Sequence, residues 1–457
     1  MLVAHRRCLL SPLSLLCLLL LLSIGAHAQP APTRAAVTYA TLGSNALRFD
    51  YYAPSTGTGP RPLVIWLHDG GWLSGNRALP TFAAPLLNRG IAIAAIDYRL
   101  TTEAGQYGSA GVNFPAQIND VKGAIRFLRA HATEFNLDPT RFGVWGSSAG
   151  GHLAALAATS GNSNELDGDV GGNLGVSSRV QAAVDYYGPI DLLTLTTDVT
   201  TPPGSIVDHD GIGAPGSLLI GFNASGQGIG VLRTNANNAR APYPNYLALA
   251  RAASPLNFVD ALDPPTYIVH GTADPQVAIR QSERLRDALN NVGVNTTYVT
   301  VPGGVHGEFS SAVHQGAIDF LANTLLAPVM PIGAPLALNG AWYELATSGQ
   351  GFEFQWLAGD ILLVFFYGHR DDGSNLFLIG TRSGRLRYGE TISLDMTVAR
   401  GGRFNGFDAT AIRRERWGSL NLRFDRCDLA DATLIGSDGT KSLRLVPLIK
   451  IAGTGCD

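Results

Sequence analysis

A serine at position 148 stands in a run whose residue types can present it as a nucleophile. The run Phe142–Ala154 reads FGVWGSSAGGHLA, so an apolar segment leads into Gly146-x-Ser148-x-Gly150 and an Ala/Leu-rich segment follows. A sharp strand-to-helix turn requires residues without bulk on either side of the nucleophile, and the two glycines meet this requirement. Such a turn exposes the serine hydroxyl at the end of a sheet, beside a helix N-terminus.

Two later segments supply the partners that a serine nucleophile needs. A serine hydroxyl is activated when a histidine removes its proton and a carboxylate orients that histidine. Asp274 lies in HGTADPQV (residues 270–277), just after a predicted buried strand, and His306 lies in the glycine-rich PGGVHG (residues 302–307) after the next strand. The order Ser, acid, His is the one expected after a strand–turn–helix serine. We therefore predict Ser148, Asp274 and His306 as a catalytic triad.

Other residues compete for these roles. Asp191, in YGPID (residues 187–191) after the preceding strand, is the alternative acid. His270 and His314 are alternative bases, although His270 ends a strand and His314 falls in a helical pattern. We expect His152, in the helix after the nucleophile, to point into the structure. An isolated Asp-Pro commonly begins a turn, so the prediction depends on the joint order of the three residues.

A pair of glycines after an earlier strand is a candidate for an oxyanion hole, which needs backbone N–H groups aimed at the developing charge. The strand Leu63–Leu67 is followed by HDGGW (residues 68–72), in which Gly70 and Gly71 lack side chains that would keep a substrate away. The N–H of Ala149, next to the nucleophile, is the expected partner donor. An ordinary Gly-Gly turn is the alternative. We expect Trp72 to pack rather than bind.

Strand and helix patterns alternate from Val37 to about Thr324, which predicts an α/β domain with a doubly wound, mostly parallel sheet. The predicted strands are Leu47–Tyr52, Leu63–Leu67, Ile91–Ile96, Arg141–Trp145, Val180–Tyr186, Thr266–Val269 and Thr297–Val301. The predicted helices are Thr81–Asn88, Pro115–His131 and Arg280–Asn290. This catalytic domain would span residues 29–326.

Three segments depart from that alternation. Residues 194–252 are rich in Gly, Asn, Pro and Ser, and we interpret them as a partly helical cap over the site; disorder of 208–216 and 225–235 is the alternative. Residues 327–338 have the composition of a linker. Residues 339–457 show short strands bounded by turns, at 351–357, 361–367, 376–381, 420–424 and 443–448, which predicts a small all-β domain.

The N-terminus has the pattern of a secretory signal peptide. Basic residues at 5–7 precede an apolar core, Leu9–Ile24, and the A-x-A site at 26–28 predicts cleavage after Ala28. An uncleaved anchor is the alternative, but Pro12 interrupts a core that is short for a membrane span. We therefore expect a secreted or periplasmic protein without a stable membrane anchor. In an oxidising compartment, Cys427 and Cys456 are expected to form a disulfide, with two buried thiols as the alternative.

Composition excludes some classes of partner and cofactor. The formal net charge is −3 over 457 residues, which gives no reason to expect a nucleic-acid partner. No group of residues has zinc-like spacing and no phosphate-binding loop occurs, so neither a metal nor an organic cofactor is expected.

Taken together, the motifs resemble the α/β-hydrolase fold, in particular the esterase branch near the hormone-sensitive-lipase-like and BD-FAE (feruloyl-esterase-like) hydrolases. The resemblance covers roughly residues 47–325. It rests on HDGGW at 68–72, DYRL at 97–100, Phe114-Pro115 with Asp120, GSSAGGHL at 146–153, HGTAD at 270–274 and GVH at 304–306. It implies Ser148 as nucleophile, Asp274 as acid and His306 as base, with Gly70, Gly71 and Ala149 as the oxyanion hole.

One position departs from the family pattern. The family's loop usually reads HGGGW, and Asp69 replaces the first glycine here, which adds a negative charge near a site that must stabilise an oxyanion. The C-terminal segment is similar to a β-rich module of exported bacterial proteins. Its aromatic residues Trp342, Tyr343, Trp356 and Tyr367 could form a carbohydrate-binding surface, but aromatic residues at alternate strand positions more often pack in a core, which we favour.

These expectations combine into an exported serine hydrolase that cleaves carboxylic esters through an acyl-enzyme. Its substrate would be a small-molecule or carbohydrate-linked ester. An amide hydrolase of the same fold, a peptidase or a formamidase, is the alternative within enzymes, because a triad does not determine the leaving group. A binding protein with a degenerate hydrolase domain is the alternative from another class.

Overall fold

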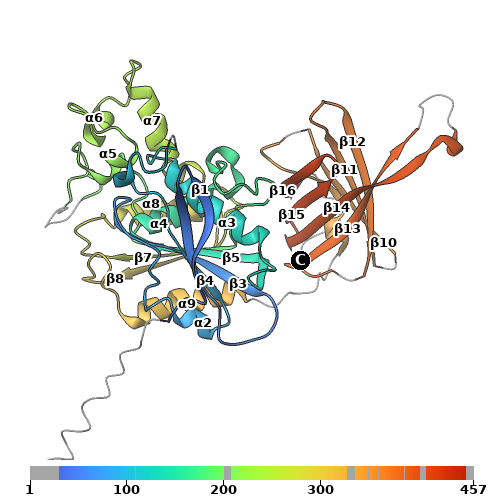
Figure 1. Cartoon of the computed structure of the whole chain (residues 1–457), viewed down its shortest axis with the longest axis horizontal. Helices are drawn as coiled ribbons and strands as arrows, with labels where there is room; N and C mark the ends of the chain where they lie inside the picture. Colours follow the sequence, from blue (N-terminus) through green and yellow to red (C-terminus); the bar gives the residue numbers. More distant parts are fainter. Residues whose placement is uncertain are drawn as a thin grey trace, which may run out of the picture.

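The computed structural model describes residues 30–448, apart from 109, 200–206, 327–334, 348, 359, 385 and 402–407 (Figure 1). The predicted signal peptide, Cys456 and most of the predicted linker lie outside the described residues. The described chain forms an α/β part and a separate β-barrel, which confirms the predicted fold class. Within the described residues, no helix has both the length and the apolar character needed to cross a bilayer.

An eight-stranded sheet lies at the centre of the α/β part. Its strand order is β1-β2-β4-β3-β5-β6-β7-β8. β1 and β4 pair antiparallel with β2, and the strands from β4 and β3 through β8 are parallel to their neighbours. The bounds are β1 (Arg34–Leu42), β2 (Asn45–Tyr52), β3 (Arg61–Leu67), β4 (Ala92–Ile96), β5 (Leu137–Ser147), β6 (Ala182–Tyr186), β7 (Thr266–Gly271) and β8 (Thr296–Val301). Each of these except β1 overlaps a predicted strand; β4 and β6 begin one and two residues later than predicted.

Helices cover both faces of this sheet because successive strand residues point to opposite sides. Ile65 of β3 lies in the cluster of buried residues that contains Ile118 of α3 (Ala116–Ala130) and Leu153 of α4 (Ala149–Thr159). Its neighbour Trp66 lies in the cluster with Leu321 on the other face. That second face carries α2 (Pro85–Asn88) and α9 (Ser311–Leu325), whereas α8 (Arg280–Asn291) packs beside α4.

The predicted cap segment contains three short helices, which lie together beyond one end of the α/β part in Figure 1. They are α5 (Pro215–Leu219), α6 (Ile229–Thr234) and α7 (Tyr243–Ala252). Arg233 of α6 forms an ion pair with Asp210 at 2.6 Å, and Phe222 packs on Tyr246 of α7 at 4.6 Å between ring centroids. The described part of this segment is therefore an ordered, partly helical insertion.

The C-terminal part is a closed antiparallel barrel, which leaves no sheet edge unpaired. Alternate residues point inward, and the interior contains aromatic side chains such as Phe352, Phe354 and Phe424. Its strands are β9 (Gly340–Tyr343), β10 (Gly351–Leu357), β11 (Ile361–His369), β12 (Asn375–Ser383), β13 (Thr391–Arg400), β14 (Arg413–Arg426), β15 (Leu429–Gly436) and β16 (Gly439–Pro447). The sequence patterns indicated five of these eight strands; β9, β13 and β15 were missed.

The aromatic residues considered for carbohydrate binding do not share one surface. Trp342 is buried inside the barrel, where its indole N–H donates to the Leu338 carbonyl oxygen at 3.0 Å. Trp356 also packs against the interior cluster, while Tyr367 is 40% exposed on the outside. Alternation along β9 and β10 sends the two tryptophans inward, so core packing, the favoured interpretation, holds for Trp342 and Trp356. Carbohydrate contact by this domain remains a prediction. Cys427 packs against the same interior, and the Cys427–Cys456 disulfide remains a prediction.

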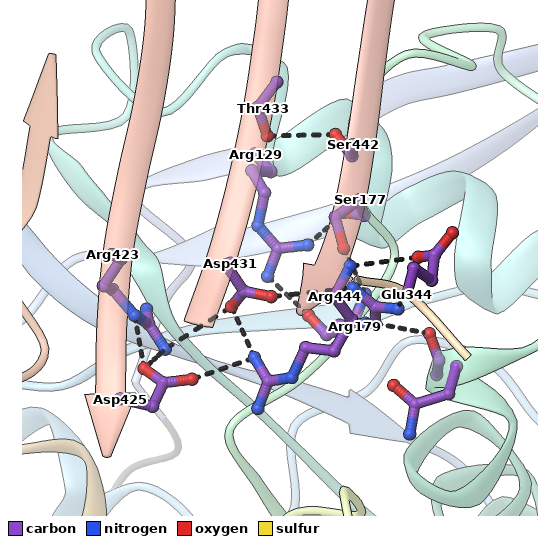
Figure 2. Close-up of polar contacts among 12 residues, drawn as sticks. Arg129, Ser177, Arg179, Glu344, Arg423, Asp425, Asp431, Thr433, Ser442 and Arg444 are labelled. Carbon is purple, nitrogen blue, oxygen red and sulfur yellow. Dashed lines mark hydrogen bonds and ion pairs between the residues drawn. The ribbon is translucent and has the colours of Figure 1, made fainter. Parts of the chain in front are cut away.

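A cluster of charged side chains joins the barrel to the α/β part (Figure 2). Arg179, in the loop before β6, lies 3.5 Å from the Glu344 carboxylate and 3.6 Å from that of Asp431 on β15. Arg444 of β16 approaches Asp431 to 2.5 Å. Burial alone would raise the pKa of Asp431, but the neighbouring guanidinium groups, that of Arg444 first, hold it well below its usual range.

The barrel docks at the end of β5 that is farther from Ser148. Arg423 of β14 donates to the Thr140 carbonyl oxygen, and Ser442 of β16 donates to that of Gly175 at 3.1 Å. Thr140 lies in the first half of β5, whereas Ser148 directly follows the last residue of this strand. At about 3.3 Å per residue, the two positions are roughly 26 Å apart along the strand.

Candidate active site

Ser148 occupies a strained turn between β5 and α4. Its φ is +52° and its ψ is −119°, a backbone conformation that a residue with a side chain rarely adopts. The turn is held by hydrogen bonds from the Ser148 N–H to the Tyr186 carbonyl oxygen, 2.8 Å, and from the His152 N–H to the Ser148 carbonyl oxygen, 2.9 Å. A Cβ at Gly146 would lie 2.1 Å from the Gly150 carbonyl oxygen, so bulk is excluded here as the sequence indicated.

The structure brings Ser148, Asp274 and His306 together. His306 follows β8, and its Nε2 lies 2.9 Å from Ser148 Oγ. Its Nδ1 lies 2.7 Å from Oδ2 of Asp274, which follows β7. The carboxyl ends of β5, β7 and β8 thus deliver the three side chains to one edge of the sheet. The side chain of Asp274 is fully buried and that of His306 is 12% exposed.

Asp274 is held as a carboxylate by several donors. Its Oδ1 accepts hydrogen bonds from the backbone N–H groups of Gln276, at 2.8 Å, and Val277, at 3.0 Å. Burial alone would raise the pKa of this carboxyl, but hydrogen bonds with His270 and His306 outweigh burial and hold its pKa well below the usual range. An ionised Asp274 fixes the Nδ1–H tautomer of His306, which leaves Nε2 free to accept the Ser148 proton.

His270, considered as an alternative base, supports Asp274 instead. It is fully buried, and its Nε2 lies 3.3 Å from Asp274 Oδ2 and 2.9 Å from the Val277 carbonyl oxygen, an arrangement in which Nε2 donates. Its Nδ1 then accepts from the Ser282 hydroxyl at 2.7 Å. Sequence reasoning missed this supporting role; the HGTAD motif, which places His270 near the end of β7 and Asp274 in the loop that follows, was the available signal.

Asp191, His314 and His152 make their contacts outside the triad. Asp191 accepts the Leu193 N–H at 3.0 Å, as a residue that begins a turn does. His314 stacks on Phe82 with ring centroids 4.1 Å apart. His152 is buried and donates from Nε2 to the Ala253 carbonyl oxygen at 2.6 Å, and burial lowers its pKa to about 4.

The predicted oxyanion donors border the same site. The Gly70 carbonyl oxygen accepts from Leu73 at 3.0 Å and Ser74 at 3.2 Å, which closes the loop into a tight turn. In the described part of the chain, the N–H groups of Gly70, Gly71 and Ala149 donate to no protein acceptor. Ala149 is the first residue of α4, where the helix dipole also favours negative charge. These N–H groups remain available to a ligand.

A cavity of about 520 Å³ opens over Ser148. One side consists of the loop 69–74 together with Ser148, Ala149 and His306. The cap segment supplies Leu195, Val207, His209, Pro215 and Gly216, and the loop after β7 supplies Gln276 and Val277. The volume falls in the range of sites for small ligands. No cluster of three or more metal-ligating side chains occurs among the residues that the structure describes.

Comparisons with known proteins find similarity to esterases. A family model described as BD-FAE matches residues 49–289. Esterase LipQ of Mycobacterium tuberculosis is 29% identical over 285 residues, and the match covers 62% of this chain and 59% of LipQ. The chain thus spans less than two thirds of that relative.

Two solved structures are also similar. A truncated carbohydrate esterase from gut microbiota is 30% identical, with a TM-score of 0.53, and the match covers 66% of this chain and 99% of that one. A bifunctional GH43-CE protein of Bacteroides eggerthii is 32% identical, with a TM-score of 0.51, and the match covers 63% of this chain and 37% of that one.

Proposed function

Because the chain belongs to the BD-FAE family and has the α/β-hydrolase fold, we propose that it is a serine hydrolase that cleaves carboxylic esters through an acyl-enzyme. One observation carries the proposal. A continuous chain of hydrogen bonds joins the three side chains. His306 Nε2 lies 2.9 Å from Ser148 Oγ, and His306 Nδ1 lies 2.7 Å from Asp274 Oδ2. This arrangement can generate an alkoxide-like nucleophile and return its proton to a leaving group.

In the acylation step, His306 Nε2 takes the Ser148 proton as Oγ attacks the ester carbonyl carbon. The carbonyl oxygen becomes an oxyanion, and the N–H groups of Gly70, Gly71 and Ala149 stabilise it. Asp274 stabilises the imidazolium of His306. The C–O bond to the alcohol then breaks, and His306 donates its proton to the departing alkoxide, which leaves as the alcohol.

In the deacylation step, His306 takes a proton from water, and the resulting hydroxide attacks the acyl carbon. The tetrahedral intermediate uses the same three N–H donors. Its collapse breaks the bond to Ser148 Oγ, which regains the proton from His306, and the carboxylic acid is released.

For the substrate, we propose a small-molecule or carbohydrate-linked ester. The cavity volume of about 520 Å³ suits an acyl group with part of its alcohol. The two similar solved structures are described as a carbohydrate esterase and a GH43-CE protein. We further propose that residues 1–28 are removed during export; N-terminal sequencing of the secreted protein that begins at Gln29 supports this, and an intact N-terminus in a membrane fraction contradicts it.

The test measures release of p-nitrophenol from acetate, butyrate and octanoate esters by the mature protein. We expect turnover that falls by roughly 10⁴- to 10⁶-fold in Ser148→Ala. Asp274→Asn should lose about 10³- to 10⁴-fold in kcat, because His306 then adopts the wrong tautomer. Asp191→Asn is the matched control, since it removes the alternative acid, and it should keep its activity within a few-fold.

A folded wild-type protein that turns over none of these esters contradicts the proposal. Labelling with a fluorophosphonate then separates amide chemistry from a binding role. Labelling that Ser148→Ala abolishes points to amide chemistry at an intact nucleophile, and absence of labelling points to a binding protein.

A further inference from the structure

Among the described residues that line the cavity over Ser148, one carries a carboxylate, Asp69. This residue precedes the two glycines of the loop after β3 and borders the cavity together with Ser148 and His306. It is exposed, and the structure gives its carboxylate no ion pair among the described residues. Its charge is therefore directed to solvent and to whatever occupies the cavity.

In the described lining of the cavity, no lysine or arginine balances this charge. The seventeen lining residues include no lysine or arginine, and apart from His209 and His306 the only ionisable one is Asp69. Burial is the main cause of the lowered pKa of His209, which makes that imidazole neutral near pH 7. Among the described lining residues, the negative charge of Asp69 is therefore not offset by a lysine or an arginine.

Any charge on a bound substrate lies within reach of this carboxylate. A sphere with the volume of the cavity is about 10 Å across, close to one Debye length at 0.1 M salt. The negative charge of Asp69 also acts on two neighbouring tyrosines. Burial is the largest cause of the raised pKa of Tyr98 and of Tyr187, and the charge of Asp69 raises both further. Tyr187 itself packs on the His306 ring at 4.5 Å between centroids.

Contacts of the His68 and Tyr98 side chains hold the backbone at Asp69 in place. The Tyr98 hydroxyl donates to the His68 carbonyl oxygen at 2.8 Å, and the two rings stack with centroids 4.1 Å apart. His68 Nδ1 lies 2.8 Å from the Asp69 carbonyl oxygen. The loop is thus fixed immediately before the oxyanion donors, and the carboxylate remains at the rim of the cavity.

From these observations we propose that Asp69 is a specificity-determining residue: it makes the site select uncharged or cationic esters and disfavour esters that carry a carboxylate. The inference rests on the proposed function. It also implies that the carboxylate product, which is anionic once it has lost its proton, is repelled from the site after deacylation.

The test compares kcat/KM for two pairs of esters of similar shape, in the mature full-length protein. The first pair is acetylcholine and its uncharged isostere 3,3-dimethylbutyl acetate. The second is the anionic 4-nitrophenyl hemisuccinate and the neutral 4-nitrophenyl pentanoate. In Asp69→Asn, which keeps the shape and removes the charge, we expect the cation-to-neutral ratio to fall and the anion-to-neutral ratio to rise, each by roughly five- to tenfold. In wild type, 0.5 M NaCl should lower the cation-to-neutral ratio and raise the anion-to-neutral ratio, because salt screens the charge of Asp69.

The matched control is Asp371→Asn, which removes the same charge from an exposed turn of the barrel and should leave both ratios unchanged. A fall in the cation-to-neutral ratio or a rise in the anion-to-neutral ratio that is specific to Asp69→Asn supports the inference, and a change of the opposite sign contradicts it. The pair affected identifies whether Asp69 faces the acyl or the alcohol side. If neither ratio changes while the neutral esters are hydrolysed, the inference is wrong and the proposed function stands. If wild type hydrolyses no ester, the proposed function itself fails.

Discussion

Two buried aspartates at the ends of neighbouring strands have opposite pKa shifts, and their hydrogen bonds explain the difference. Asp274 receives two backbone N–H groups and two imidazoles, which lower its pKa. Asp185, at the end of β6, receives only the Gly188 N–H, at 2.9 Å, and its Oδ2 has no partner in the described part of the chain. Burial therefore dominates at Asp185 and raises its pKa to about 6.

Asp185 is expected to make the protein less stable as the pH rises. Its pKa is higher in the folded state than in the unfolded state, so the folded state binds more protons between pH 4 and 6, and stability falls across that interval. We predict that the free energy of unfolding of Asp185→Asn, which mimics the neutral acid, rises by about 2 kcal/mol relative to that of wild type as the pH goes from 4 to 7. Urea denaturation at both pH values measures this difference. If wild type and the variant differ by the same free energy of unfolding at both pH values, the prediction is wrong.

At the scale of elements, the three residues proposed as the triad could be found from sequence because each follows directly from a local pattern. The run around Ser148, the HGTAD motif and the glycine-rich loop at His306 each combine a buried strand with a turn, and parallel strands bring such turns to one edge. β13 was missed although its residues, TISLDMTVAR, alternate as a strand should. β9 has only four residues, too few for periodicity to indicate it. The closure of the barrel depends on the pairing of β9 with β16, which is remote in sequence.

The contact between β3 and α4 tolerates no side chain at Gly150. A Cβ at this position would lie 2.1 Å from the Leu67 carbonyl oxygen, and neither backbone segment can yield without moving Ser148 or the oxyanion loop. We predict that Gly150→Ala costs about 3 kcal/mol or more in the free energy of unfolding, as overpacking against backbone does. Gly111→Ala serves as the control, because no atom lies within 4 Å of its added Cβ. Equal melting temperatures for the two variants would refute the prediction.

At the scale of the whole molecule, the junction between the two parts is built from charges that sequence patterns could not pair. Arg179 and Asp431 are far apart in the chain, and either would be interpreted from sequence as an exposed polar residue. In the structure, Asp431 is surrounded by the guanidinium groups of Arg444, Arg423 and Arg179. Arg444 and Arg423 belong to the barrel, like Asp431, and Arg179 is the member of this set that the α/β part contributes. Docking therefore completes the cluster by adding the third guanidinium group.

Neutralising Asp431 should loosen the junction. Asp431→Asn removes a negative charge from beside three buried guanidinium groups. We expect the free energy of unfolding to fall by about 3–5 kcal/mol. Asp395→Asn removes an exposed partner of Arg416 and should cost less than about 1 kcal/mol.

Because the pKa of Asp431 is lower in the folded state, the same stabilisation in wild type is present above the unfolded pKa near 4 and is lost as the pH falls below it. Guanidinium denaturation of the two variants, with wild type measured from pH 7 to 3, checks both expectations. Equal losses in the two variants would show that the cluster is not the principal link.

The barrel and Ser148 lie at opposite ends of β5, and these positions have a practical consequence for attachment. β11 lies four strands from β15 in the closed barrel, so it is on the side turned away from the α/β part. A resin, a fusion partner or a cell surface tethered to that side would leave the mouth of the cavity open toward the surrounding liquid. An enzyme held in this way would reach dissolved esters or neighbouring fibres more readily than the material to which it is fixed.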